Sequence, residues 1–125
     1  MRASMVSEST TILYRPVGQQ ELDLIRASGF TAFPPRLPEQ PIFYPVLNET
    51  YATEIARDWN AKHNTPKVGY VTCFSVRTEY IQQFEIHTVG AAIHQEYWIP
   101  AEGLDEFNRN IVGPIEVIAE YRGTD

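Results

Sequence analysis

The pattern of apolar and polar positions predicts an alternation of short strands and helices along the chain. Strands are expected where β-branched and aromatic residues run together between prolines and glycines, and helices where apolar residues recur at every third or fourth position. The expected strands are residues 11–15, 42–47, 68–76, 85–89, 93–99 and 115–121. The expected helices are residues 18–28, 48–62 and 101–110, with one helical turn within residues 78–84.

Individual residues mark where these elements begin and end. Pro16 is expected to stop the first strand, and Pro45 has to lie at a sheet edge or a bulge because it has no N–H to donate. Gly29 stands where a left-handed C-terminal cap belongs, and Asn48 is a favoured N-cap for the next helix. The inward faces are expected to comprise Tyr51, Ala52, Ile55 and Trp59 in that helix, Leu104 and Phe107 in the last helix, and Ile115, Val117 and Ala119 in the last strand.

The order of the elements favours the α+β class. Several strands follow one another late in the chain, which fits α+β better than a doubly wound parallel sheet. A length of 125 residues is typical of one domain. The small polar residues 1–10 are expected to form a flexible tail, so we expect a single α+β domain over residues 11–125.

The composition excludes several classes of function. A formal net charge of −6 disfavours nucleic acid as a passive partner, because phosphate contacts need clustered Lys and Arg. No apolar run approaches the roughly 20 residues that cross a bilayer, and the N-terminus lacks the apolar core of a signal peptide. We therefore expect a cytoplasmic protein with no membrane partner. The one cysteine, Cys73, excludes an internal disulfide and is expected to be a buried small residue.

Proline is concentrated in one segment of the chain. Five of the nine prolines fall close together, at Pro34, Pro35, Pro38, Pro41 and Pro45. A segment so rich in proline cannot be a regular helix or strand. It is either a stiff connector or a rigid lip that presents Arg36 and Glu39 over a cleft.

Histidine and glutamate gather on two neighbouring late strands. By the two-residue period of a strand, Glu85 and His87 share one face, as do His94 and Glu96 on the next strand. A hairpin between the strands could bring the four side chains together, and such sets bind zinc or iron. One hypothesis is therefore a small His/Glu metalloprotein. The alternative is that these histidines are polar surface residues.

A carboxylate also stands between large aromatic residues within residues 93–99. Alternation puts His94, Glu96 and Trp98 on one face of this strand, and Gln95, Tyr97 and Ile99 on the other. A carboxylate in such surroundings needs a partner or a use. Glu96 is thus either paired with a cation such as Arg15 or held for the function of the protein.

The chain resembles small bacterial proteins of the ADP-ribosylation/crystallin J1-like family in three segments, LYRPVG, FPPRLPEQPIFYPVLNETYA and HQEYWIPAEGLDEFNRNIVGPIEV. An Arg on the first strand, an aromatic strand that enters a helix, and a Glu on a late strand are also similar to the ADP-ribosyltransferase superfamily. The resemblance covers nearly all of the chain beyond the tail. It implies a split, mixed or antiparallel sheet with a few short helices around a NAD-binding cleft.

The resemblance also implies roles for particular residues. Glu96 matches the catalytic glutamate, and Arg15 matches the first-strand residue that holds the adenosine ribose or phosphate side of NAD. Either Phe43 or Tyr44 matches the second-strand position near the nicotinamide pocket, and the sequence leaves the choice open. Tyr51 lies just inside the following helix, where a second aromatic residue packs against the nicotinamide ring.

Three further residues are candidates for phosphate and acceptor contacts. A guanidinium such as that of Arg15 or Arg36 suits a pyrophosphate, because it offers bidentate donors. His94 stands two positions before Glu96, where toxin-like members carry a Glu or Gln that handles the acceptor. Gln95 takes the place of the Asn in the Asn-Glu-Tyr sequence of the poly-ADP-ribose branch.

Three functional hypotheses follow. The first is a mono-ADP-ribosyltransferase that moves ADP-ribose from NAD to an unknown acceptor, which could be a protein, a nucleic acid or a small molecule. It expects Arg15 and Glu96 to line one pocket of about 300–1,000 Å³. The second is a non-catalytic binding module with the same fold, which expects an occluded cleft and an Arg15–Glu96 ion pair. The third is the metalloprotein that uses His87, His94 and Glu96.

Overall fold

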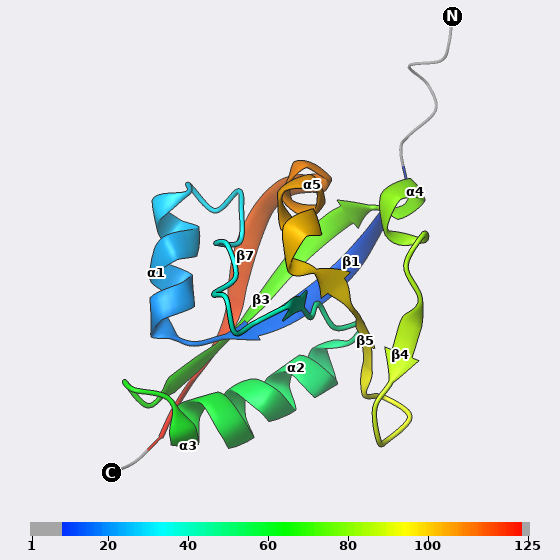
Figure 1. Cartoon of the computed structure of the whole chain (residues 1–125). Helices are drawn as coiled ribbons and strands as arrows, with labels where there is room; N and C mark the ends of the chain where they lie inside the picture. Colours follow the sequence, from blue (N-terminus) through cyan, green and yellow to red (C-terminus); the bar gives the residue numbers. More distant parts are fainter. Residues whose placement is uncertain (1–8, 124–125) are drawn as a thin grey trace, which may run out of the picture.

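The computed structural model describes residues 9–123, in which helices and strands are mixed (Figure 1). The strands are β1 (Thr10–Val17), β2 (Ile42–Phe43), β3 (Val68–Arg77), β4 (Ile86–Thr88), β5 (Gln95–Tyr97), β6 (Ile99–Pro100) and β7 (Ile111–Arg122). The helices are α1 (Gln19–Ala27), α2 (Glu49–Ile55), α3 (Ala61–His63), α4 (Thr78–Ile81) and α5 (Leu104–Arg109), with a π-helical turn η2 (Ala56–Asn60) and a 3₁₀ turn η3 (Ala101–Gly103). The expected tail lies outside the described residues up to position 8, and Thr10 already belongs to β1.

Antiparallel pairing organises the sheet around β3. This strand lies between β1 and β7, while β2 pairs with β6 and β4 pairs with β5. Val46 forms isolated bridges with Tyr14 on one side and Glu96 on the other, so one residue connects β1 to β5. Helices and antiparallel strands in small sheets confirm the α+β class.

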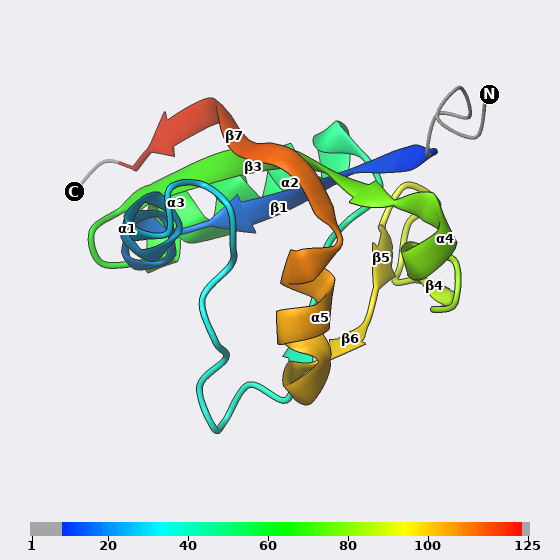
Figure 2. The same cartoon turned by 90° about the horizontal axis from the view of Figure 1, so that it is seen from above.

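The two faces of the central sheet carry different cores. Alternation along β1 directs Leu13 and Val17 into the larger core, together with α1, α5 and the aromatic residues of the proline-rich segment. Figure 2 shows α5 and the cyan loop that follows α1 on the same side of β3. The opposite face packs Tyr14 and Val71 against Ala52 and Ala56 of α2 and η2.

The two prolines of the first strands act differently from expectation. The sequence predicted that Pro16 stops β1, but the strand continues to Val17, with Pro16 opposite Val71 of β3. Tyr14 uses its N–H and C=O on the outer edge to pair with Val46, and the two-residue period turns the Pro16 nitrogen toward the same edge. Its missing N–H is therefore not needed by β3. The strand predicted over residues 42–47 is shorter in the structure, where β2 ends at Phe43. Pro45 has no N–H with which to continue the pairing, although its carbonyl accepts from the Tyr97 N–H.

The helix after β2 begins as predicted and then changes its pitch. Asn48 is the N-cap, and its Oδ1 accepts from the Tyr51 N–H at 2.7 Å. The last part of the predicted helix includes the π-turn η2, which has five-residue hydrogen-bond spacing and so shifts the side chains that follow it. As a result Trp59 is 60% exposed, whereas the sequence placed it on the same inward face as the fully buried Ala52.

The remaining expectations are partly confirmed. Gly29 has φ +77° and its N–H bonds to the Arg26 carbonyl, as expected of a left-handed cap. Leu104, Phe107 and Ile115 are buried as predicted. Val117 is 40% exposed, because register shifts between β3 and β7 interrupt the inward alternation of the last strand.

Two expectations from the composition concern the cysteine and membrane-spanning segments. Cys73 is half-buried in β3 rather than fully buried, and burial raises the pKa of its thiol above the ordinary value. Within residues 9–123, no helix is long and apolar enough to cross a membrane.

Candidate functional site

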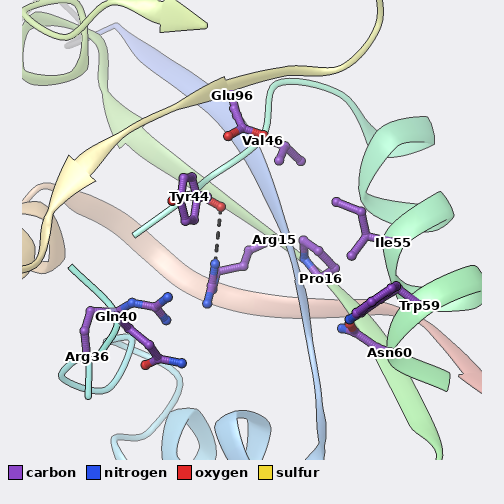
Figure 3. Close-up of a pocket in the computed structure, with 10 residues that line it drawn as sticks. All are labelled: Arg15, Pro16, Arg36, Gln40, Tyr44, Val46, Ile55, Trp59, Asn60 and Glu96. Carbon is purple, nitrogen blue, oxygen red and sulfur yellow. Dashed lines mark hydrogen bonds between the residues drawn. The ribbon is translucent and has the colours of Figure 1, made fainter. Parts of the chain in front are cut away.

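A pocket of about 520 Å³ opens beside β1, as Figure 3 shows. Its walls come from β1, the proline-rich segment, residues 44–46, the α2–η2 helix and β5. The lining residues are Arg15, Pro16, Arg36, Gln40, Tyr44, Val46, Ile55, Trp59, Asn60 and Glu96. Arg15 and Glu96, which the sequence placed far apart along the chain, thus belong to one pocket of the size usual for small-molecule sites.

Glu96 is held by two neutral donors. The Tyr51 hydroxyl donates to Oε1 and the Trp98 indole N–H donates to Oε2, each at 2.7 Å. The residue is 8% exposed, and each carboxylate oxygen keeps one further acceptor position for a ligand. Burial and the neighbouring carboxylate raise the pKa of Tyr51, so its hydroxyl stays a donor. The carboxylate is therefore fixed in place while its negative charge is not neutralised by either donor.

Arg15 forms its ion pair with a residue that the sequence did not single out. Its Nε and Nη2 donate to the two oxygens of Glu21 at 2.7 and 3.0 Å, and its Nη1 donates to the Tyr44 carbonyl at 3.3 Å. The guanidinium carbon lies 4.5 Å from the centre of the Phe43 ring. Within the described residues no ion pair joins Arg15 to Glu96, so the ion pair expected of a non-catalytic module is not formed.

Arg36 brings a second guanidinium to the same pocket. Its Nε donates to the Ile42 carbonyl at 3.2 Å, and its guanidinium carbon lies 5.9 Å from the centre of the Phe43 ring. Among residues 9–123 its two terminal nitrogens have no hydrogen-bond partner. Burial and the charge of Arg15 lower the pKa of Arg36. An anion bound between the two guanidinium groups would favour the charged form of Arg36 and so oppose this lowering of its pKa.

The structure separates the two aromatic candidates of the second strand. Phe43 is fully buried, does not line the pocket, and supports the two guanidinium groups from below with its ring. Tyr44 is 39% exposed and lines the pocket. Of the two residues, Tyr44 is therefore the one whose side chain reaches the pocket.

The sequence predicted both His87 and His94 in strands, but only His87 lies in one, since β5 begins at Gln95. Both histidines lie outside the pocket lining and stack on the residues that hold Glu96. His94 stacks on Tyr51 with ring centres 4.4 Å apart, and its Nε2 lies 2.9 Å from Glu54 Oε1. His87 stacks on Trp98 at 3.8 Å. Across residues 9–123, no three side chains of His, Cys, Asp or Glu gather in a group that could hold a metal ion.

The acceptor candidate Gln95 also has a backbone role in this arrangement. It pairs with Thr88 in the β4–β5 ladder, and its carbonyl accepts from the Leu47 N–H at 3.0 Å. Its side chain does not line the pocket. Of the eight candidate site residues, the pocket therefore brings together Arg15, Arg36, Tyr44 and Glu96, and Tyr51 joins them through its bond to Glu96.

Several pocket residues were not predicted from the sequence as site residues. Trp59 and Asn60 enter through the π-turn, which no periodicity in the sequence marks. Gln40 belongs to the proline-rich segment, in which the sequence indicated only the charged residues Arg36 and Glu39 as candidates. Glu21 could have been found, because an acidic residue in the first turn of α1 follows Arg15 by six positions across a tight connection.

Comparisons with family models, curated proteins and solved structures found no match to this chain.

Proposed function

We propose that the pocket binds NAD and that the protein transfers ADP-ribose from it to an acceptor, with Glu96 as the catalytic residue. One observation carries the proposal: a fixed carboxylate that is not paired with a cation lines the same pocket as two guanidinium groups. This combination suits a ligand that has phosphates at one place and develops positive charge at another. NAD has both properties, and the family resemblance of the sequence also favours it.

Glu96 is suited to the bond-breaking step. When the glycosidic bond to nicotinamide breaks, the bonding electron pair goes to the nicotinamide nitrogen and neutralises it, and the ribose becomes oxocarbenium-like. A carboxylate that accepts from the 2′-hydroxyl and faces this developing charge stabilises the transition state more than the ground state. The two donors of Glu96 leave one acceptor position on each oxygen for this purpose.

The acceptor completes the reaction. Its nucleophilic oxygen or nitrogen forms a bond to the anomeric carbon of the ribose and loses a proton to solvent. Water can take the same role, which would release free ADP-ribose and nicotinamide. His94 occupies the position that the resemblance links to the acceptor, but its side chain bonds to Glu54 and stacks on Tyr51. We therefore expect another part of the pocket rim to select the acceptor.

The phosphate and ring contacts follow from the other lining residues. The free terminal nitrogens of Arg36 and the remaining N–H groups of Arg15 can donate to a pyrophosphate. Tyr44 and Trp59 offer aromatic surface against which a nicotinamide ring can stack.

A two-part experiment tests the proposal. Calorimetric titration with NAD should give saturable binding, and a nicotinamide-release assay should show slow turnover in water. Glu96→Gln should lower the release rate by about 10²–10³ while NAD still binds. Glu85→Gln removes an exposed carboxylate near β4 and serves as the matched control, which should leave the rate unchanged. Absence of NAD binding overturns the proposal, whereas binding without nicotinamide release in the wild type would indicate a non-catalytic module.

A further inference from the structure

A second, smaller pocket of about 250 Å³ lies between α1 and the proline-rich segment. Apolar side chains line it on both sides, with Leu24 on the helix and Pro34, Pro35 and Leu37 on the loop. The polar residues Gln20, Glu21, Arg36 and Gln40 complete the lining. Leu24 is 53% exposed and Leu37 is 55% exposed, so both keep a large part of their apolar surface open to a ligand. Apolar walls on two sides are suited to a flat ring that enters between them.

This groove adjoins the NAD pocket proposed above. Arg36 and Gln40 line both of them. Figure 3 shows these two side chains together at one end of the view, Glu96 at the other end, and Arg15 between them. The order from Glu96 is thus carboxylate, guanidinium groups, then the groove.

The order of chemical groups in NAD is the same. A nicotinamide riboside is joined through a pyrophosphate to an adenosine. If the nicotinamide ribose lies at Glu96 and the pyrophosphate at the guanidinium groups, the adenosine leaves the first pocket past Arg36 and Gln40. The groove is the apolar surface that it meets there.

Gln40 supplies a polar contact for the edge of a base. Its Oε1 accepts from the Leu37 N–H at 3.0 Å, which fixes the orientation of the amide. Among residues 9–123 its Nε2 has no hydrogen-bond partner, so two N–H groups remain to donate. The ring nitrogens of adenine are acceptors, and amide side chains recognise adenine by such bonds.

A third pocket, of about 440 Å³, also touches Gln40 and is a less suitable place for the base. It shares Gln20, Glu21 and Gln40 with the groove. Its other side chains are Gln19, His63, Asn64 and Thr65, so it has no leucine or proline wall. Such walls suit sugar hydroxyls or water rather than the apolar faces of a purine.

We propose that the groove between α1 and the proline-rich segment is a binding site for the adenine base of the dinucleotide. The inference rests on the proposed function for its ligand, but its test uses AMP and nicotinamide mononucleotide, two probes that share a ribose phosphate and differ in the base. Leu24 and Leu37 hold the two faces of the ring, Gln40 donates to its edge, and Arg36 binds the phosphate that links the two sites.

Titrations followed by NMR test this site on the intact chain. AMP should shift the signals of Leu24, Leu37 and Gln40, whereas nicotinamide mononucleotide should shift those of Trp59 and Glu96. Leu37→Ser should weaken AMP binding about tenfold, as expected for lost apolar contact in a pocket, and should leave the affinity for nicotinamide mononucleotide unchanged. Because Leu37 is 55% exposed, the variant is expected to fold, and Leu24→Ser provides a second test.

Ile12→Ser is the matched control, because Ile12 is 54% exposed on β1 and lines none of the three pockets described here. It should leave AMP binding unchanged. The inference is overturned if AMP does not bind, if it shifts only His63 and Asn64, or if Leu37→Ser has no effect. Cleavage of NAD together with any of these results would refute the groove and leave the proposed function standing. Binding of both AMP and NAD in the groove without release of nicotinamide would refute the transfer reaction and leave the groove standing.

Discussion

Replacing Tyr51 with Phe removes a single oxygen, which lies 2.7 Å from Oε1 of Glu96. The aromatic ring and its stacking on His94 remain possible, as does the capping bond from the Tyr51 N–H to Asn48. The substitution therefore isolates one of the two hydrogen bonds that hold the carboxylate. The other bond, from Trp98, is left in place.

The expected cost follows from the charge and burial of the acceptor. A hydrogen bond to a charged group contributes about 1.5–3 kcal/mol to stability. Glu96 is 8% exposed but lines a pocket, so water can replace part of the lost bond. We therefore expect Tyr51→Phe to lower the free energy of unfolding by about 1.5 kcal/mol, at the lower end of that range.

A double-mutant cycle with Glu96→Met identifies the origin of this loss. Methionine has a similar length and its sulfur accepts a hydrogen bond only weakly, so Tyr51→Phe should cost less than about 0.5 kcal/mol in that background. Urea unfolding of the four proteins gives the coupling energy, which we expect to be about 1 kcal/mol or more. If the two substitutions are additive within about 0.5 kcal/mol, the bond does not hold Glu96 and our account of the site is refuted.

Three further predictions concern the fold. Asn48→Ala should destabilise the protein by about 1 kcal/mol through loss of the N-cap, measured by urea unfolding, and an unchanged stability would argue against the cap. Gly69→Ala should lower the free energy of unfolding by about 3 kcal/mol or more, because its Cβ would lie 2.2 Å from the Ala56 carbonyl oxygen. Gly29→Ala serves as the comparison: its Cβ meets no atom within 4 Å, so it should cost only the strain of its positive φ, about 1–2 kcal/mol. Burial raises the pKa of Tyr80 to about 12, so the unfolded chain loses this proton first and stability should fall as pH rises from 10 toward 12; Tyr80→Phe should flatten that slope in unfolding curves recorded against pH.

Local signals in the sequence located most of the elements. The cap at Asn48, the left-handed Gly29 and the apolar run that became β3 each depend on neighbours within a few positions. Leu104 and Phe107 were predicted inward from helical spacing, and both are buried. Such features could be predicted because the physical cause and its effect lie close together along the chain.

Features that depend on distant contacts could not be predicted in this way. The π-turn packs its Ala56 carbonyl against Gly69, a contact between segments that periodicity within the helix does not report. That turn brings Trp59 to the pocket. The bulges between β3 and β7 likewise expose Val117, because they depend on the pairing of two strands rather than on the pattern of one.

The candidate site shows the same division. Arg15 and Glu96 could be identified as candidate site residues from the sequence, but their hydrogen-bond partners could not. The sequence left open whether the two residues form an ion pair with each other. In the structure Arg15 pairs with Glu21, and Glu96 accepts from Tyr51 and Trp98. Arg15 meets Glu21 across the short connection from β1 to α1, whereas Glu96 is placed by the register of Val46 between β1 and β5.

That register, together with Pro16, explains why a pocket exists at this edge of the sheet. Val46 pairs with Tyr14 through both backbone groups, at 2.9 and 2.8 Å, and bridges to Glu96 on its other side. Two residues further along β1, Pro16 turns toward the same edge a nitrogen that cannot donate, so backbone pairing cannot continue as an ordinary ladder there. The proline that was expected to end the strand thus ends only its outer pairing, and the space beyond Val46 is left to the side chains of Arg15 and Glu96.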